Sequence, residues 1–393
     1  MQHFAHLSAP ARARVFEVDP EPFDPDADPG LLAVALGATL YCPATRKDLG
    51  AQVLKQAGRG VLSMVLCLED AIPDCEVELG ETNLVASLVE HHEGAARRRG
   101  PSADGPLLFV RVRRPDQITD LARRLGPALV TLTGFVLPKF GPENGLAYLD
   151  AISEASRQGG HRLLAMPVME SPQITHEETR MQALSWCQSV LNSRRRDVLA
   201  VRVGATDLSA VYGLRRSREL TVYDVRVVAQ VITDIVNRLG RADGTGFVIT
   251  GPVWEYFSGG ERVFKPRLRQ SLFEQHQAAD LRTQLISADM DGLIREVELD
   301  KANGLTGKTV IHPSHVMAVH ALQVVTHEEH ADALDVVGSR SRGGVSTSGY
   351  RNKMNESKPH TAWAERTLTR ARVFGVARPD ITFVEILAAS MLS

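Results

Sequence analysis

Short runs of apolar residues alternate along the chain with longer segments in which apolar residues recur every three or four positions. The short runs contain few polar residues, which is typical of strands buried on both faces of a parallel sheet. We predict eight strands, at residues 38–43, 61–68, 107–113, 134–138, 162–168, 198–204, 247–253 and 308–312. We predict helices between most of them, at residues 47–57, 80–98, 116–126, 143–158, 177–194, 221–239 and 290–303.

This alternation of strands and helices indicates an α/β fold, and eight repeats fit a TIM (β/α)8 barrel. A doubly wound open sheet is the alternative. No GxGxxG or Walker-type loop follows an early strand, which weakens that alternative. We therefore predict that residues 33–325 form a (β/α)8 barrel.

Two further segments flank the predicted barrel. Residues 17–30 are rich in Asp, Glu and Pro, so we expect residues 1–32 to form an irregular arm. A Gly- and Ser-rich stretch at 337–352 precedes two helix-like segments. We therefore expect residues 326–393 to form a C-terminal helical appendage or lid.

Composition narrows the class of protein. The 393 residues carry a net charge of −2, which gives no field that would favour nucleic acid or an anionic membrane. No apolar run reaches the length of a membrane span, and the first 30 residues lack the apolar core of a signal peptide. The cysteines have no metal-site spacing, and Cys42 and Cys67 lie in apolar runs. We expect a cytoplasmic protein with no nucleic-acid or membrane partner.

Carboxylates follow the ends of three predicted strands. Glu69 and Asp70 follow the second strand, Glu170 the fifth and Asp207 lies just beyond the sixth. In barrel enzymes the carboxyl ends of the strands carry the active site. Glu170 and Asp207 could share a hard cation such as Mg²⁺, and Glu69 and Asp70 could orient water or a basic group. The alternative is that all four are ordinary carboxylates that cap helices or face solvent.

Basic residues occupy the two strands in between. Arg111 and Arg113 lie two apart on the third strand and so share a face. An arginine in an apolar strand needs a partner, which is either a substrate carboxylate or Glu69 and Asp70. Lys139 ends the fourth strand, where it is either a Schiff-base nucleophile or a salt-bridge partner.

Two other motifs also allow two interpretations. The segment 254–277 follows the seventh strand and carries four basic residues: Arg262, Lys265, Arg267 and Arg269. It could hold a phosphate-bearing ligand or be a solvated loop. His312 and His315, which follow Lys308, have a spacing that could bind a metal. The Pro and Ser between the two histidines favour a turn that starts a helix.

Seven short motifs occur in a family-specific order. They are Tyr41-Cys42-Pro43 with Arg46-Lys47, Leu68-Glu69-Asp70, Val110-Arg111-Val112, Leu137-Pro138-Lys139, Met169-Glu170, Gly204-Ala205-Thr206-Asp207-Leu208 and Gly307-Lys308 with Ile311-His312-Pro313. With these motifs, residues 36–325 resemble the citrate lyase β-subunit-like family within the HpcH/HpaI aldolase group. The C-terminal part is similar to a divergent bacterial branch of C–C bond lyases.

The resemblance implies a TIM barrel with a divalent metal, usually Mg²⁺ with Mn²⁺ as the alternative, held by Glu170 and Asp207. It implies that Arg111 binds a 2-oxo or acyl substrate and that a carbon–carbon bond is cleaved or formed through a metal-stabilised enolate. The substrate would be a small carboxylate, either free or as a CoA ester. The protein would be a homo-oligomer, a trimer or hexamer.

The remaining assignments also follow the family motifs. We place the substrate against Arg111, Arg46 and the segment Gly204, Ala205 and Thr206, where backbone N–H groups start the next helix. Besides Arg111, we assign catalytic roles to three residues: Glu69, Asp70 and Lys139.

The C-terminal section does not match the usual family lid, which in acyl-CoA members supplies an acid from a neighbouring subunit. The use of a CoA ester and the identity of the proton donor therefore stay open. The alternatives in function are an acyl-thioester hydrolase on the same site, or a non-catalytic metabolite-binding subunit of a stress-response complex.

Overall fold

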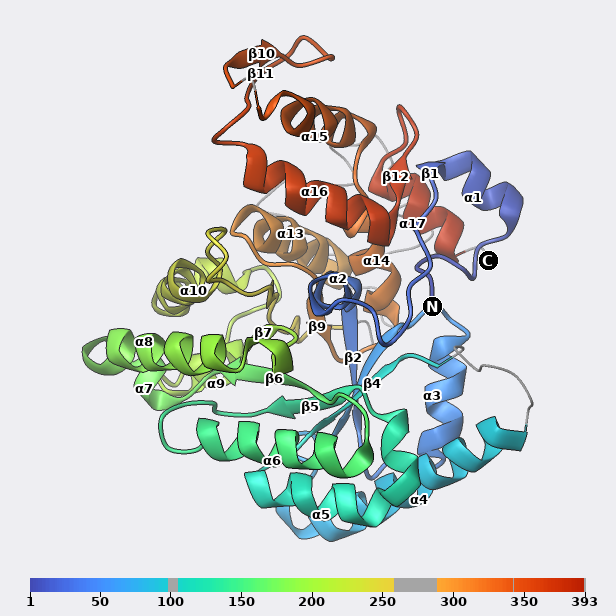
Figure 1. Cartoon of the computed structure of the whole chain (residues 1–393), viewed down its shortest axis with the longest axis vertical. Coiled ribbons are helices and arrows are strands. Elements are labelled where there is room, and N and C mark those ends of the chain that lie inside the picture. The colour runs from blue at the N-terminus through green and yellow to red at the C-terminus, as the bar shows by residue number, and fades with distance from the viewer. Residues whose placement is uncertain (98–104, 258–287, 342, 392–393) are drawn as a thin grey trace.

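The computed structural model describes residues 1–97, 105–257, 288–341 and 343–391 (Figure 1). Eight parallel strands form one sheet: β2 (Ala38–Pro43), β3 (Ser63–Cys67), β4 (Leu107–Arg111), β5 (Gly134–Leu137), β6 (Leu164–Met169), β7 (Val201–Val203), β8 (Ile249–Thr250) and β9 (Lys308–Val310). Their order is β8-β7-β6-β5-β4-β3-β2-β9, and a parallel bridge between Gly251 and Lys308 joins the two edges. The sheet is therefore a closed barrel, and the predicted TIM fold is confirmed.

Helices follow the strands and cover the outside of the barrel. They are α3 (Leu49–Ala57), α4 (Val77–Arg97), α5 (Pro115–Leu125), α6 (Gly145–Gly159), α7 (Pro172–Thr175), α8 (Glu177–Ser193), α9 (Ala205–Ala210), α10 (Arg226–Leu239), α13 (Ala288–Ala302) and α14 (Ser314–Gln323). Every residue of β3 and β6 is buried, because these strands pack against side chains inside the barrel and against helices outside it. All seven predicted helices are present, most within three residues of the expected bounds.

One predicted helix begins later than expected. The pattern predicts a helix from residue 221, whereas α10 begins at Arg226. Thr221 and Asp224 form a capping box that starts a short 3₁₀ turn over Val222–Asp224. The chain then leaves the helical conformation at Val225, so the apolar spacing spans two separate turns.

The N-terminal segment is more ordered than predicted. Residues 9–15 form helix α1 (Ala9–Val15), and β1 (Phe16–Val18) pairs antiparallel with β12 (Val376–Ala377). Helix α2 (Pro29–Ala35) precedes the barrel. The prediction that residues 1–32 are irregular is therefore wrong for these elements, because Phe4 and Phe16 are buried in the core and anchor the segment.

The C-terminal section forms the two predicted helices, α16 and α17, and a hairpin that was not predicted. Its elements are α15 (His327–Ser339), β10 (Val345–Thr347), β11 (Met354–Glu356), α16 (Thr361–Phe374) and α17 (Phe383–Met391). The first strand of the hairpin lies in the Gly- and Ser-rich stretch expected to be a break, and the second lies just after it. It is held by the buried carboxylate of Asp332, which accepts hydrogen bonds from Ser348 and Asn355.

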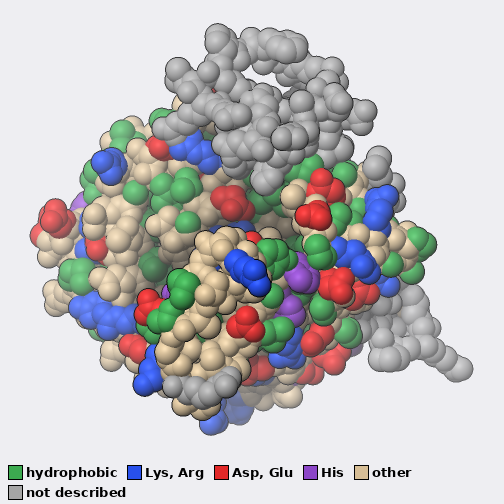
Figure 2. Space-filling model, turned by 90° about the horizontal axis from the view of Figure 1, so that it is seen from above, with side chains coloured by type: hydrophobic (Ala, Val, Ile, Leu, Met, Phe, Trp, Pro, Cys, Tyr) green, Lys and Arg blue, Asp and Glu red, His purple; other side chains and the backbone are tan. Residues whose placement is uncertain are grey.

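This appendage packs on the end of the barrel where the strands begin (Figure 1). Helix α16 contacts α2, α17 contacts α14, and Arg366 donates to the carbonyl of Gly240 ahead of β8. Acidic and basic side chains are interspersed on the surface seen from above the view of Figure 1 (Figure 2). Within one chain the appendage therefore lies at the end opposite the carboxyl ends of the strands, not over them as a lid.

The structure also places the cysteines and tests the chain for membrane-spanning helices. Cys42, Cys67 and Cys187 are buried free thiols, and Cys75 is an exposed one. No helix in the described ranges is long and apolar enough to cross a membrane. The four basic residues of the segment after β8, which are Arg262, Lys265, Arg267 and Arg269, lie outside the described residues.

Candidate active site

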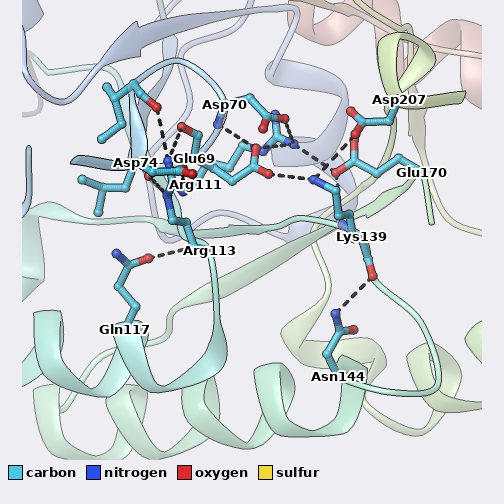
Figure 3. A network of polar contacts seen from close by, with 12 residues as sticks. Glu69, Asp70, Asp74, Arg111, Arg113, Gln117, Lys139, Asn144, Glu170 and Asp207 are labelled. Atoms are coloured by element: carbon cyan, nitrogen blue, oxygen red, sulfur yellow. Dashed lines mark hydrogen bonds and ion pairs between the residues drawn. The ribbon is translucent and has the colours of Figure 1, made fainter. Parts of the chain in front are cut away.

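Four carboxylates and two cationic side chains meet at the carboxyl end of the barrel (Figure 3). Carboxyl ends of barrel strands are where TIM-barrel enzymes hold their active sites. The residues, with the strands they end or follow, are Glu69 and Asp70 (β3), Arg111 (β4), Lys139 (β5), Glu170 (β6) and Asp207 (β7). The structure thus brings together all six residues predicted to be catalytic or metal-binding.

Arg111 lies at the centre of this cluster. Its Nη2 atom is 2.8 Å from Glu69 Oε2, 3.0 Å from Glu170 Oε1 and 3.4 Å from Asp70 Oδ2. Burial disfavours the charge of Arg111, but the neighbouring carboxylates, chiefly Glu170, outweigh burial and raise its pKa. The Nε–H group is buried without a hydrogen-bond partner among the described residues. Since an unpaired buried donor is costly, this group is suited to bind a ligand oxygen.

Glu170 is fixed from several sides and is 2% exposed. Its Oε1 atom accepts hydrogen bonds from Arg111 and, at 3.0 Å, from the backbone N–H of Lys139. Lys139 has a φ of 48°, a left-handed conformation that costs a non-glycine residue about 1–2 kcal/mol. On the other side, a Cβ atom on Gly204 would lie 1.9 Å from Glu170 Oε2. Only glycine leaves room there for the carboxylate.

The Lys139 ammonium group links two of the carboxylates. Its Nζ atom is 2.8 Å from Glu69 Oε1 and 3.6 Å from Asp207 Oδ1. Burial disfavours the charged amine, but Glu69 and Asp207 outweigh burial and raise its pKa. Asn144 donates to the backbone carbonyl of Lys139 and so holds the turn after β5. The geometry therefore favours a protonated lysine over a nucleophilic one.

The carboxylates differ in their pKa values. Burial opposes ionisation of Glu69, but Arg111 and hydrogen bonds from Asp70 and Lys139 lower its pKa to about 2. Burial and the neighbouring Glu69 raise the pKa of Asp70 to about 6. Because the Asp70 side chain is also 58% exposed, it is suited to take up and release a proton near neutral pH.

Arg113 holds the loop after β3 instead of facing the cluster (Figure 3). Its guanidinium donates to the carbonyl oxygens of Leu68, Glu69 and Ile72 and forms an ion pair with Asp74. These bonds fix the backbone that carries Glu69 and its neighbour. Of the two arginines predicted to share a face, one enters the site and the other supports it.

The predicted substrate-binding segment lies beside the cluster. Gly204, Ala205 and Thr206 start α9 just before Asp207. Ala205 and Thr206 line a cavity of about 260 Å³ on the far side of the segment, whose lining includes Arg216 and Glu255 but none of the six cluster residues. Arg46 is exposed after β2, and none of the ion pairs of the described residues joins it to a site carboxylate. Of the predicted substrate contacts, Arg46 is therefore the one that the structure does not bring into the network.

The two histidines after β9 form a turn and the start of a helix, as the alternative interpretation predicted. His312 Nδ1 lies 2.7 Å from Ser314 Oγ, and the His312 ring stacks on Phe257 with centroids 4.8 Å apart. His315 is buried at the start of α14. No cluster of three or more His, Cys, Asp or Glu side chains in the described part of the chain has metal-binding geometry.

Glu170 and Asp207 nevertheless fit a hard divalent cation. Mg²⁺ keeps several waters and binds through one or two carboxylates, so it needs no complete protein cage. Burial, together with the charge of Asp207, raises the pKa of Glu170 to about 7 although Arg111 opposes the shift. A cation beside the two carboxylates would relieve their repulsion. The oxygen donors of this pair are of the kind that Mg²⁺ and Mn²⁺ prefer.

Sequence reasoning missed one polar residue in the barrel. Arg202 lies on β7 within the apolar run 199–203 and is 1% exposed. A single charge inside a buried strand is the same signal that singled out Arg111.

The sequence matches the family model of C–C bond lyases of the TIM-barrel fold over residues 30–376. This match spans most of the chain, so the protein belongs to that family and is an enzyme of the carbon–carbon lyase class. The family membership predicted from the seven motifs is thereby confirmed.

Solved structures that share the fold include the following two. A citrate lyase from Burkholderia xenovorans LB400 has a TM-score of 0.60 and 15% identity, and the match covers 90% of this chain and 96% of that chain. CitE from Mycobacterium tuberculosis, in complex with magnesium, acetoacetate and coenzyme A, has a TM-score of 0.50 and 21% identity. That match covers 86% of this chain and 99% of the other. No curated protein matches the sequence of this chain.

Proposed function

We propose that this lyase cleaves or forms a carbon–carbon bond in a small carboxylate substrate in a Mg²⁺-dependent reaction. The substrate would be a 2-oxo acid or an acyl group, the latter either free or as a CoA ester. The observation that carries the proposal is the placement of Glu170 and Asp207 in one cluster with the Arg111 guanidinium. The magnesium, acetoacetate and coenzyme A of the M. tuberculosis CitE complex support the substrate class.

Cleavage next to a carbonyl leaves negative charge on an enolate oxygen, which must be stabilised. When bound, Mg²⁺ (or Mn²⁺) would supply Lewis-acid stabilisation of that oxygen, and Glu170 and Asp207 would hold the ion. Arg111 would bind the substrate carbonyl or carboxylate through its unpaired Nε–H and its fixed charge. Ala205 and Thr206 would contact the rest of the substrate from the cavity beside α9.

Asp70 would transfer the proton at the reacting carbon. Its pKa of about 6 and its exposed side chain distinguish it from Glu69, which stays ionised. Glu69 would hold Arg111 and Lys139 in place through its two oxygens. In this scheme Lys139 contributes a positive charge and the backbone N–H that fixes Glu170.

Three other functions or mechanisms of the same site can be distinguished by the state of Lys139 or by the products. A Schiff base on Lys139 would require a neutral amine, which the two neighbouring carboxylates disfavour. An acyl-thioester hydrolase would yield a free thiol and an intact acid, whereas a lyase yields two carbon fragments. A metabolite-binding subunit without catalysis would yield no product, and membership of the lyase family weighs against it.

Calorimetric titration tests the proposal. EDTA-stripped protein is titrated with Mg²⁺, and then with oxalate, an enolate mimic, in the presence and absence of Mg²⁺. We expect oxalate to bind only with Mg²⁺ and the Glu170→Gln variant to lose this binding. Glu143→Gln is the matched control, because Glu143 is an exposed carboxylate on the turn after β5. Absence of Mg²⁺-dependent oxalate binding by the wild type would contradict the proposed site.

The family resemblance also supports a homo-oligomer, which we propose to be a trimer or hexamer in the cytoplasm. Light scattering coupled to size-exclusion chromatography measures the mass of the assembly. A monomeric mass at micromolar concentration would contradict this part of the proposal.

A further inference from the structure

Arg202 is a buried cation inside the barrel with only neutral partners. Its Nη1 atom lies 3.4 Å from Thr39 Oγ1 and 3.7 Å from Met166 Sδ, and its Nη2 group donates to Thr309 Oγ1. The centre of the guanidinium is 5.5 Å from the centroid of the Tyr41 ring. These partners come from β2, β6 and β9, so the side chain crosses the barrel interior. No described carboxylate forms an ion pair with it.

The other buried cations of the described chain are paired with carboxylates. Lys308 lies 3.0 Å from Glu296 and 2.7 Å from Asp300, both on α13. Arg180 lies 2.8 Å from Asp234. These pairs offset the desolvation of each charge, as stable buried ions require. Arg202 lacks such a partner, and a buried charge without one lowers the stability of the fold.

Arg202 lies one layer of side chains below the candidate site. It lies on β7 (Val201–Val203), two residues before Gly204, and pairs with Val168 of β6, two residues before Glu170. Gly204 in turn is the residue against which the Glu170 carboxylate packs. Burial lowers the pKa of Arg202, Tyr41 opposes the shift, and repulsion by the charge of Arg111 adds to it.

The phenol of Tyr41 lies close to both guanidinium groups. Arg202 and Arg111 both interact with it electrostatically, and the Arg202 guanidinium also lies over its ring. Tyr41 therefore connects the buried Arg202 to Arg111 in the candidate site. Without Arg202, the cluster contains four carboxylates and two cations. This excess of negative charge disfavours the binding of an anionic substrate.

We propose that Arg202 is a positioning residue that supplies, through Tyr41 and from beneath the site, the positive charge that lets an anionic enolate bind above it. The inference rests on the proposed function. It explains why a costly unpaired charge stands at this position: the missing negative partner is the bound substrate. A purely structural role, in which Arg202 only ties three strands together, makes different predictions for stability and for binding.

The positioning role and the purely structural role predict opposite effects of Arg202→Met on Mg²⁺ affinity and on stability. Under our proposal, Arg202→Met removes a cation from the site, so Mg²⁺ alone binds as tightly or more tightly, while oxalate in saturating Mg²⁺ binds about tenfold more weakly or worse. The unliganded variant should unfold at an equal or higher urea concentration, because replacing a buried charge by a well-packed apolar side chain is often neutral or stabilising. If Arg202 has a purely structural role, Arg202→Met should instead lower stability and weaken the binding of both Mg²⁺ and oxalate.

The experiment measures Mg²⁺ affinity, oxalate affinity in saturating Mg²⁺ and urea unfolding for the wild type and three full-length variants. Arg202→Lys keeps the charge and should retain part of the oxalate affinity that Arg202→Met loses. Arg180→Met is the matched control, because it breaks a buried ion pair with Asp234 and should lower stability. If it is too unstable to purify, Arg202→Lys against Arg202→Met still separates charge from packing.

Unchanged oxalate affinity in Arg202→Met would overturn the inference, and so would parallel loss of stability and of both affinities. If the wild type itself bound no oxalate in the presence of Mg²⁺, the proposed function would fail, and the inference with it. The wild-type measurement therefore separates failure of the proposed function from failure of the role of Arg202.

Discussion

Replacement of Gly204 by alanine tests the close approach of β7 to the Glu170 carboxylate. Gly204 has a φ of −95°, which alanine also adopts, so the substitution acts through the space it fills. The new Cβ would lie 1.9 Å from Glu170 Oε2, and real Cβ atoms essentially never approach another heavy atom within 3.0 Å. The carboxylate must therefore move by at least about 1.1 Å, the difference between these distances.

A shift of this size removes one of the two proposed metal ligands. Mg²⁺ requires oxygen ligands at about 2.0–2.1 Å in near-octahedral geometry, so a ligand displaced by half that length no longer binds well. Overpacking of a filled site costs about 1–3 kcal/mol. If the wild-type position of Glu170 is restored only in the metal-bound state, this strain corresponds to a loss of about 5- to 150-fold in Mg²⁺ affinity.

Calorimetric titration with Mg²⁺ measures this loss, and urea unfolding measures the strain in the unliganded protein. Gly141→Ala is the control, because its Cβ would lie an ordinary 3.7 Å from Ser171 Oγ at the same end of the barrel. We expect weaker Mg²⁺ binding in Gly204→Ala and unchanged binding in Gly141→Ala. Wild-type affinity in Gly204→Ala would refute the reasoning, because the position of Glu170 would then not matter for the metal.

Three further predictions follow from the described contacts. Asp207→Ala should abolish Mg²⁺ binding and still unfold cooperatively, because its contact in the cluster is the 3.6 Å approach to Lys139; unchanged metal affinity would show that the ion binds elsewhere. Borohydride with pyruvate should leave Lys139 unmodified by mass spectrometry, since its pKa is raised and the amine stays protonated, and an adduct there would favour the Schiff-base mechanism. Burial lowers the pKa of His3 from 6.5 to about 4, so below pH 6.5 the unfolded chain binds a proton that the folded chain does not. Unfolding free energy should therefore fall by about 3 kcal/mol between pH 6.5 and pH 4, and His3→Gln should reduce the slope; an equal slope in that variant would contradict the assignment.

The barrel could be predicted because its signals are local. Each buried strand is a continuous apolar run, and helices such as α10 show a clear apolar spacing in sequence. The pairing of β1 with β12 joins residues 16–18 to residues 376–377, and no pattern within either short segment indicates it. The β10–β11 hairpin depends on the buried carboxylate of Asp332, so composition alone indicated a break there.

The candidate site could be predicted as a set of residues but not as a network. Strand ends placed Glu170, Asp207 and Lys139 at one end of the barrel, because parallel strands share that edge. The sequence did not reveal that Arg111 would contact three carboxylates or that Arg113 would hold a loop. These choices depend on side-chain directions and on backbone details such as the positive φ of Lys139, which no periodicity encodes.

Exchange of substrate protons tests the central claim of metal-dependent enolate chemistry most directly. The full chain is incubated in deuterium oxide with pyruvate or acetyl-CoA, and NMR follows loss of the methyl protons with Mg²⁺ and with EDTA. We predict Mg²⁺-dependent exchange in at least one of the two compounds, and its loss in Glu170→Gln. No exchange in either compound with Mg²⁺, or exchange that persists in EDTA, would contradict the account.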